Sequence, residues 1–482
     1  MKLKQLTITL ITVCIAIVFG PKAVEAASLT TIVDGISNAR GASFDSEGNL
    51  YVGEPGIGGD GNCQPSPSTL FQPICAGNSG SVVKVTPDGQ EERLFNNFQS
   101  LAEQPSGNQG AGPQAIEFDS SGSAYLLTGF AGYPGNRDPE LSALGNTAGI
   151  PPEQLATFPP SSPDRLLNTP NLAKLYKADL NTQQLTEVFD FGKYEITNNP
   201  DGGDIVTNPY ELTISGNDAY VVDGGGNAVY NIKLDGSNEV KATALPKNLV
   251  DNPEFPPLPP GQELPPGLVE IPASALPEGQ APGEPGEVPS QVLSQSVPTG
   301  AAVGPDGALY VGEYVGFPYP EGNARIFRIG EDGNPDVFLD GFTQITDLTF
   351  DKEGNLLVLQ FGDESQLTGD LASLPGSLIQ VAPDGTRTTL VAAGEGLESA
   401  DGVVVGPDGQ IYVTNRGVGP EAGSVVRVDD IGGAAAVPEP SSLLGLLVFG
   451  AIGGGTWFKR KQQQGREAIA PEPEEILTQS SI

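Results

Sequence analysis

Six segments of the chain share one pattern of apolar and polar positions. Each has a short run of β-branched, aromatic or small residues, then a turn that contains glycine or asparagine, then a second apolar run, as in "GASFDSEGNLYVGE" from Gly41. The other five segments begin at Ala115, Glu211, Gly300, Asp347 and Gly402. Two short apolar runs joined by such a turn are typical of a β-hairpin. The acidic turn residues could also be read as calcium loops, but no regular alternation of oxygen ligands follows them, which favours turn chemistry.

A third and a fourth apolar run follow the hairpin in most repeats. The third runs include "GSVVKVTPDG" and "ARIFRIGEDG", and the fourth include "EERLF" and "DVFLDGF". A four-stranded antiparallel unit repeated six times predicts an all-β fold, a six-bladed β-propeller. A solenoid would repeat as well, but it would not need the same four-stranded unit. A seventh blade in Gly129–Leu172 or Pro246–Pro298 is excluded because neither segment has paired apolar runs.

The sixth repeat has no fourth strand of its own, because "GSVVRVDD" is followed directly by "IGGAAAVPEP". Near the other end of the chain, "LTTIVDGISNARG" parallels "RTTLVAAGEGLESADG", which is a fourth strand with its onward link. We therefore predict that the N-terminal strand completes the last blade and closes the ring, which leaves no open edge between the first and last blades.

The N-terminus has the order of a signal peptide over residues 1–26. Lys2 and Lys4 precede an apolar run from Leu6 to Gly20, and Val24-Glu25-Ala26 offers small residues for cleavage. An uncleaved anchor is the alternative, although the run is short for a spanning helix. Export would leave two cysteines, Cys63 and Cys75, which favours a local disulfide over two free thiols.

The C-terminal region departs from the rest of the chain. A nearly continuous apolar stretch, Ser442–Phe458, is long enough to be a minimal membrane span, and Lys459, Arg460 and Lys461 follow it. The segment 437–461 resembles the PEP-CTERM sorting signal in its motif Val437, Pro438, Glu439 and Pro440, its apolar helix and its basic cluster. The resemblance implies an exosortase-like partner and at least transient membrane anchoring. A polar tail, 462–482, runs beyond the point where that family usually ends.

The body, residues 27–436 with a Pro-rich insertion at 246–298, resembles NHL-type propellers in its repeats. Over most of its length it is similar to the ScyD/ScyE family, which is linked to scytonemin biosynthesis in cyanobacteria and whose members often carry PEP-CTERM tails. The resemblance implies an exported propeller at the cell surface, in the periplasm or outside the cell. It also implies an association with pigment synthesis or with extracellular matrix.

Composition restricts the chemistry. The formal net charge is −36 and there is no histidine. The charge argues against nucleic acid as a partner, since phosphates would be repelled. The lack of histidine excludes Ser-His-Asp and Cys-His machinery and any imidazole metal site. Catalysis would need carboxylates, tyrosine, lysine, amides or an oxygen-ligated metal.

The long insertions all fall in links that lie on one face of the predicted propeller, hereafter the loop-rich face. They are Pro55–Asn78, Gly129–Leu172 and Pro246–Pro298. Loops are where binding residues are commonly placed, although long Pro-rich loops can also be spacers. On this face, polar residues should meet an unknown small molecule, glycan or protein. Those at the ends of the second strands are Glu54, Thr128, Asp223, Glu313, Gln360 and Asn415. Those at the starts of innermost strands are Arg40, Glu211, Asp347 and Asp401.

Two functions remain open. The first is a non-catalytic binding or scaffold module. The second is a metal-assisted hydrolase or lactonase similar to gluconolactonase-type propellers, in which Glu54, Asp223 and Glu313 would hold Ca²⁺ or Mg²⁺ and activate water. The alternative to any site is that these polar residues line a wet channel and cap strand ends.

Overall fold

The computed structural model describes residues 27–429, except 67–68, 70–71, 146–165, 238 and 252–290, together with residues 435–436. The chain divides into two compact units, 1–437 and 438–482, and the described residues belong to the first. The predicted signal peptide at 1–26, the sorting segment at 437–461 and the polar tail at 462–482 lie outside the described residues.

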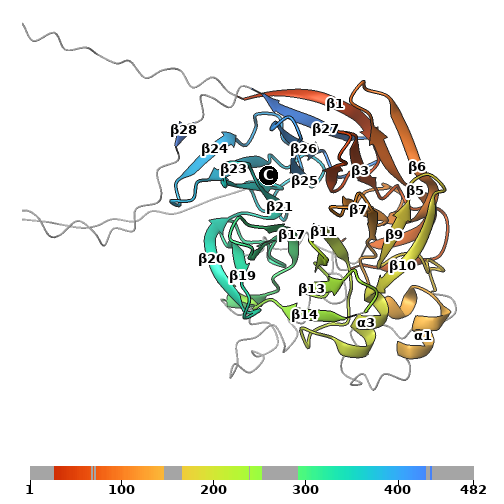
Figure 1. The fold of residues 1–482 in the computed structure, drawn as a ribbon. Helices are drawn as coiled ribbons and strands as arrows, with labels where there is room; N and C mark the ends of the chain where they lie inside the picture. The colour runs from red at the N-terminus through yellow and green to blue at the C-terminus, as the bar shows by residue number, and fades with distance from the viewer. Residues whose placement is uncertain are drawn as a thin grey trace, which may run out of the picture. The chain divides into compact units, whose positions relative to one another are not determined.

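Six antiparallel blades with four blade strands each form the body, and two of their sheets gain a short extra strand, β4 or β28 (Figure 1). Blade 1 contains β2 (Ala42–Phe44), β3 (Leu50–Glu54), β5 (Pro73–Val85) and β6 (Glu91–Glu103), and blade 2 contains β7 (Pro113–Phe118), β8 (Ala124–Thr128), β9 (Lys174–Asp179) and β10 (Gln184–Asp190). Blade 3 contains β11 (Pro209–Ser215), β12 (Asp218–Asp223), β13 (Ala228–Lys233) and β14 (Val240–Ala244), and blade 4 contains β17 (Pro298–Val303), β18 (Leu309–Glu313), β19 (Ala324–Ile329) and β20 (Pro335–Phe342). Blade 5 contains β21 (Ile345–Phe350), β22 (Leu356–Gln360), β23 (Ser377–Val381) and β24 (Arg387–Val391), with β28 (Ala435–Ala436) at its edge, and blade 6 contains β25 (Gly402–Val405), β26 (Ile411–Asn415) and β27 (Gly423–Asp429). The predicted all-β six-bladed propeller is confirmed.

The ring is closed by the first strand of the body, β1 (Ser28–Ile36). It pairs antiparallel with β27 and supplies the fourth strand of blade 6. The register runs from Ser28 opposite Asp429 to Ile36 opposite Gly423, with Val33 opposite Val425. The predicted closure by an N-terminal strand is therefore confirmed, and the repeat count was sufficient to find it.

The innermost strands surround the axis in the order β2, β7, β11, β17, β21, β25, and β25 contacts β2 again. Small residues in these strands allow close approach between blades. A Cβ on Gly300 would lie 2.6 Å from the Cα of Asp347 in the next blade. The second strands of the blades are almost entirely buried between their neighbours. The apolar core therefore lies between adjacent blades, around a narrow axis.

Acidic residues in the short turns act as turn formers. The Asp45 carboxylate accepts hydrogen bonds from the backbone N–H groups of Glu47 and Asn49, both at 2.9 Å, and from the Asn49 side chain at 2.7 Å. Asp351 has the same three interactions with Glu353 and Asn355 in blade 5. These side chains satisfy backbone donors within the turn, which is the role that the sequence favoured over calcium loops.

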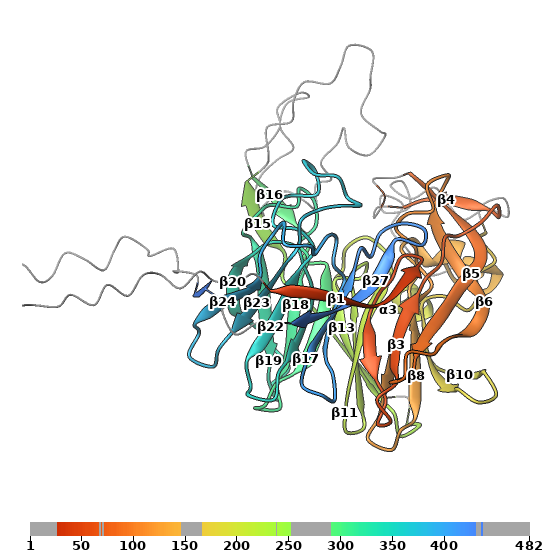
Figure 2. The ribbon, with the colours of Figure 1, turned by 90° about the horizontal axis from the view of Figure 1, so that it is seen from above.

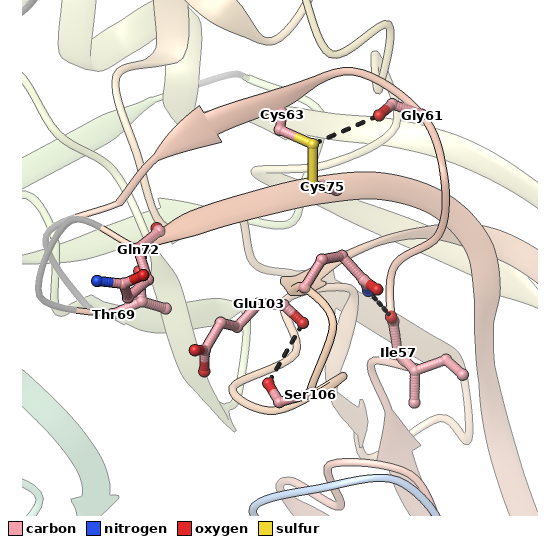
Figure 3. The surroundings of a disulfide bond; sticks show 9 residues. Ile57, Gly61, Cys63, Thr69, Gln72, Cys75, Glu103 and Ser106 are labelled. Carbon is pink, nitrogen blue, oxygen red and sulfur yellow. Dashed lines mark hydrogen bonds between the residues drawn. A yellow bond between two sulfur atoms is a disulfide. The ribbon is translucent and has the colours of Figure 1, made fainter.

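The insertions rise from one face of the ring. In blade 1, β4 (Cys63–Pro65) pairs with the extended start of β5, and a disulfide joins Cys63 to Cys75 (Figure 3). Between β14 and β17, β15 (Asn248–Asp251) pairs with β16 (Gln291–Ser294). Figure 2 shows β4 and the β15–β16 pair on the same side of the body.

Other links contain short helices. The link between β8 and β9 holds η2 (Pro134–Asn136) and α1 (Pro139–Gly145), and the link between β10 and β11 holds α3 (Phe191–Asn198). No helix in the described part of the chain is long and apolar enough to cross a membrane. The predicted span Ser442–Phe458 lies outside that part.

Candidate functional site

In five of the six blades, the residue that ends the second strand holds the link that leads into the same blade. In blade 4, the Glu313 carboxylate accepts hydrogen bonds from the Ser296 hydroxyl at 2.7 Å and from the Arg325 backbone N–H at 3.0 Å. The Arg325 guanidinium adds two charge-assisted bonds, from Nε at 2.5 Å and Nη2 at 2.9 Å. Glu313 is 0% exposed. Its carboxylate is thus committed to a local network.

The two other predicted metal ligands are bound in the same way. Glu54 is buried and accepts hydrogen bonds from a hydroxyl, a backbone N–H and a guanidinium, which belong to Ser81, Ser37 and Arg93. Asp223 is 0% exposed and accepts four hydrogen bonds, from the hydroxyl of Thr207 and the backbone N–H groups of Asn208, Gly225 and Gly226.

The remaining strand-end residues repeat this arrangement with neutral side chains. Gln360 Oε1 accepts from the Thr343 backbone N–H at 2.7 Å. Asn415 Oδ1 accepts from the Glu398 backbone N–H at 2.8 Å. In blade 2, the Thr128 hydroxyl bonds instead to the backbone of the link that leads to β9. The side chains at these six positions therefore anchor the links between strands by hydrogen bonds.

The structure does not gather Glu54, Asp223 and Glu313 into one metal site. Each is held by partners in its own part of the ring, and within the described ranges no three His, Cys, Asp or Glu side chains form a group that could hold a metal ion. These contacts agree with the alternative to a metal site, in which such residues cap strand ends.

A different set of side chains meets at the axis on the loop-rich face. The Arg40 guanidinium forms an ion pair with Asp401 at 3.1 Å and donates to the Gly417 carbonyl oxygen at 2.6 Å. The Tyr210 hydroxyl donates to the same Asp401 oxygen at 2.5 Å, and Arg40 lies 5.7 Å from the centre of the Tyr210 ring. Arg40, from blade 1, and Asp401, from blade 6, are buried at 7% and 3% exposure. Arg40 Nε has no hydrogen-bond partner among the described residues.

Aromatic side chains extend this group outward. Tyr314 follows β18, and its pKa is raised well above the usual value by burial and by neighbours that include Asp401. Its hydroxyl donates to Gln366 Oε1 at 2.6 Å, and its ring lies 5.7 Å from that of Phe361 and 6.2 Å from that of Tyr319. We call Arg40, Tyr210, Tyr314 and Asp401 the axial cluster. Tyr210, Tyr314 and Tyr319 are half-buried.

Three further acids, which we call the axial acids, lie on the innermost strands. They are Glu117, Glu211 and Asp347. Burial raises the pKa of Asp347 to about 8, with a contribution from Asp401, although its carboxylate accepts backbone hydrogen bonds from Leu348 and Val403. Burial also raises the pKa of Glu117 to about 8, and burial with repulsion from Asp347 raises that of Glu211 well above its usual range. These shifts favour the protonated form of the three acids, in which a carboxyl group can donate a hydrogen bond.

Four of the predicted residues belong to the axial cluster or to the axial acids. Arg40, Glu211, Asp347 and Asp401 were predicted at the starts of innermost strands, and the structure places them at the axis. Glu117 was missed, although it lies two residues after Ala115, a repeat position, and period-two alternation returns it to the same side of the strand. Tyr210 and Tyr314 were missed because nothing in the repeat marks them.

The comparison with protein families adds one match. Residues 436–461 match the PEP-CTERM protein-sorting motif. This is an exported, surface-directed protein. The match supports recognition by exosortase-type sorting machinery, as the sequence predicted. No curated protein matches the chain.

Solved propeller structures resemble the body weakly. A streptogramin B lyase is 12% identical, with a TM-score of 0.40, over 85% of this chain and 100% of the other. A virginiamycin B lyase from Staphylococcus aureus is 10% identical with a TM-score of 0.38, over 84% and 99%. A gluconolactonase from Xanthomonas campestris is 11% identical with a TM-score of 0.42, over 83% and 90%. Similarities this weak carry no inference about activity.

Proposed function

We propose that this exported propeller is a non-catalytic binding module, and that it binds a polyhydroxylated ligand, such as a cell-surface glycan, at the axial cluster. The observation that carries the proposal is the convergence of half-buried tyrosines with buried polar groups on the loop-rich face. Binding sites commonly combine apolar or aromatic walls with a few fixed polar groups.

Each part of the cluster suits such a ligand. The rings of Tyr210 and Tyr314 provide flat apolar surface with a polar tip. Arg40 and Asp401 are fixed by burial and by mutual hydrogen bonds, so ordering them on binding has little entropic cost. The axial acids, as neutral carboxyl groups, would donate hydrogen bonds to hydroxyl oxygens. Polar recognition of an uncharged ligand is consistent with a site that contains both signs of charge.

A glycan-array measurement on the full-length protein in mild detergent tests this proposal. Tyr314→Ala should weaken binding of any captured glycan by about tenfold or more, because it removes an aromatic contact surface. The control is Phe338→Ala, which removes an aromatic side chain that is 45% exposed on β20. Absence of glycan binding by the parent, or equal loss in both variants, would contradict the proposal.

The second candidate is the metal-assisted hydrolase or lactonase that would use Glu54, Asp223 and Glu313. Each of these carboxylates already accepts three or more hydrogen bonds, so metal binding would require their networks to open. Lactone turnover that depends on Ca²⁺ or Mg²⁺ and is lost in Glu54→Gln would favour the hydrolase over the binding module.

A further inference from the structure

A buried carboxyl group with no hydrogen-bond partner lies beside blade 3, away from the axial cluster. Glu195 belongs to α3, and its side chain is 0% exposed. Neither Oε1 nor Oε2 has a hydrogen-bond partner among the described residues. Buried polar groups in proteins are nearly always paired, because an unpaired one loses its hydration without compensation. The surroundings of Glu195 should therefore show what could satisfy it.

Oxygen-bearing groups from three segments lie around Gly226. A Cβ at this position would lie 3.2 Å from Glu195 Oε2, 3.4 Å from the carboxyl carbon of Asp223 and 3.5 Å from the carbonyl oxygen of Val206. The residue has no side chain, so these groups can approach the same point. Helix α3, the end of β12 and the link before β11 thus each contribute an oxygen-bearing group.

Two more buried oxygens nearby have no partner in the described part of the chain. One is the hydroxyl of Tyr230, which is 0% exposed and close enough to Glu195 for the acid to contribute to its raised pKa. The other is Oδ1 of Asn199, the residue that caps the C-terminus of α3 four positions after Glu195. All the unpaired atoms here are oxygens.

The charges around Glu195 are negative. Burial raises its pKa to about 9, and Asp223 and Asp201 add to that shift, while the neighbouring Tyr230 hydroxyl acts in the opposite direction. Asp223 accepts four hydrogen bonds, which stabilise its charged form. No lysine or arginine in the described ranges forms an ion pair with Glu195, Asp201 or Asp223. A bound cation would offset the negative charges beside Glu195 and favour its ionised form.

We propose that Glu195 is a ligand of a divalent cation, calcium in the first place, bound beside Gly226 between α3 and the end of β12. Calcium takes six to eight oxygen ligands in flexible geometry, including carboxylates, backbone carbonyls, amides and water. Since no three acidic side chains of the described part form a metal group alone, the site completes its shell with the Val206 carbonyl, neutral side-chain oxygens and water. Few charged ligands imply weak binding, with a Kd of about 10⁻⁴ to 10⁻³ M, the range of extracellular modules.

Thermal melting of the full-length protein in mild detergent tests the site, first in chelator and then in 10 mM calcium chloride. The parent melting temperature should rise by about 2–3 °C, because the ligand binds only the folded state. Glu195→Gln keeps the size of the side chain but removes its charge, so it should fold in chelator and show no rise. Glu140→Gln is the matched control, because Glu140 lies on the neighbouring helix α1 with its side chain 70% exposed. It should respond like the parent.

A second variant tests the same point without changing any charge. Gly226→Ala places a methyl group 3.2 Å from Glu195 Oε2 and should reduce the calcium response. No response of the parent at 10 mM calcium would overturn the proposal and leave Glu195 as a neutral buried acid beside the Tyr230 hydroxyl. An equal response of the parent, Glu195→Gln and Gly226→Ala would also overturn it, because calcium would then bind elsewhere. Neither result depends on whether the axial cluster binds a glycan.

Discussion

The Arg40 guanidinium and the Asp401 carboxylate form a buried ion pair at 3.1 Å across the junction of the first and last blades. The two residues are 361 positions apart, and the pair lies beside the point where β1 closes the ring. The same contact therefore belongs both to the closure of the propeller and to the candidate ligand site.

Asp401→Asn should lower the free energy of unfolding by about 3–5 kcal/mol, because it leaves the Arg40 charge buried without its partner. Urea denaturation measures this loss. The control is Glu398→Gln, which breaks an ion pair with Arg416 whose side chains are 38% and 53% exposed. An exposed pair contributes about 1 kcal/mol or less. Similar small effects in both variants would show that the pair does not stabilise the junction.

Substitution within β1 tests closure of the ring. Val33 is 3% exposed and lies opposite Val425, so Val33→Asp should destabilise the body by about 3 kcal/mol or more, because it buries an unpaired charge. Thr31→Asp changes an exposed residue of the same strand and should have little effect. Thermal melting compares the two. If β1 did not pack as the last strand of blade 6, both variants would melt like the parent.

The axial acids make stability depend on pH. The pKa of Glu117 is raised to about 8 in the folded protein by burial, while the unfolded chain ionises near its ordinary value of 4.5. The contribution of this group to stability is therefore fully present below about pH 4.5 and is lost progressively as pH rises to about 8. Glu117→Gln cannot ionise, so its melting temperature should fall less than that of the parent between pH 5 and 8. Identical profiles would show that Glu117 titrates normally.

Substitution of Glu313 distinguishes two roles for this residue: a buried anchor of its link, or an exposed ligand at a channel mouth. Glu313→Gln should cost about 2–4 kcal/mol, because the buried Arg325 contact loses its ionic partner. A residue at an open channel mouth could be changed with almost no loss. Glu331→Gln, in an exposed turn of the same blade, is the control. Unfolding by urea at constant pH measures the stability of both variants. Equal stability would show that Glu313 does not anchor its link and is available as a ligand.

The fold could be predicted because its signals are local and repeated. Turn residues such as Asp45 and Asp351 bond to the backbone two and four positions away. Each hairpin can therefore be predicted from a few consecutive residues. The closing strand was found for the same reason, since it repeats the pattern of a fourth strand. The β15–β16 pair was missed because its short strands flank a long Pro-rich segment without clear alternation.

The site was predicted less well because its contacts are not local. Tyr210 meets Asp401 across 191 positions, and no feature of either sequence neighbourhood marks the pair. Conversely, Glu54, Asp223 and Glu313 recur at one repeat position, which suggested a shared ring. Recurrence at a repeat position can equally reflect a structural task repeated in each blade, and the hydrogen bonds of these residues show such a task.

The pairing of β1 with β27 also determines when the body can be completed during synthesis. The ribosome makes β1 before every other described strand, and β27 is made after all six blades have begun; Thr30 and Asp429, which hydrogen-bond in the finished sheet, are 399 positions apart. Until β27 is available, β1 remains an unpaired strand with open backbone donors and acceptors, a state prone to wrong pairing. If the exported chain crosses the membrane unfolded, the ring closes only after nearly the whole body has reached the far side.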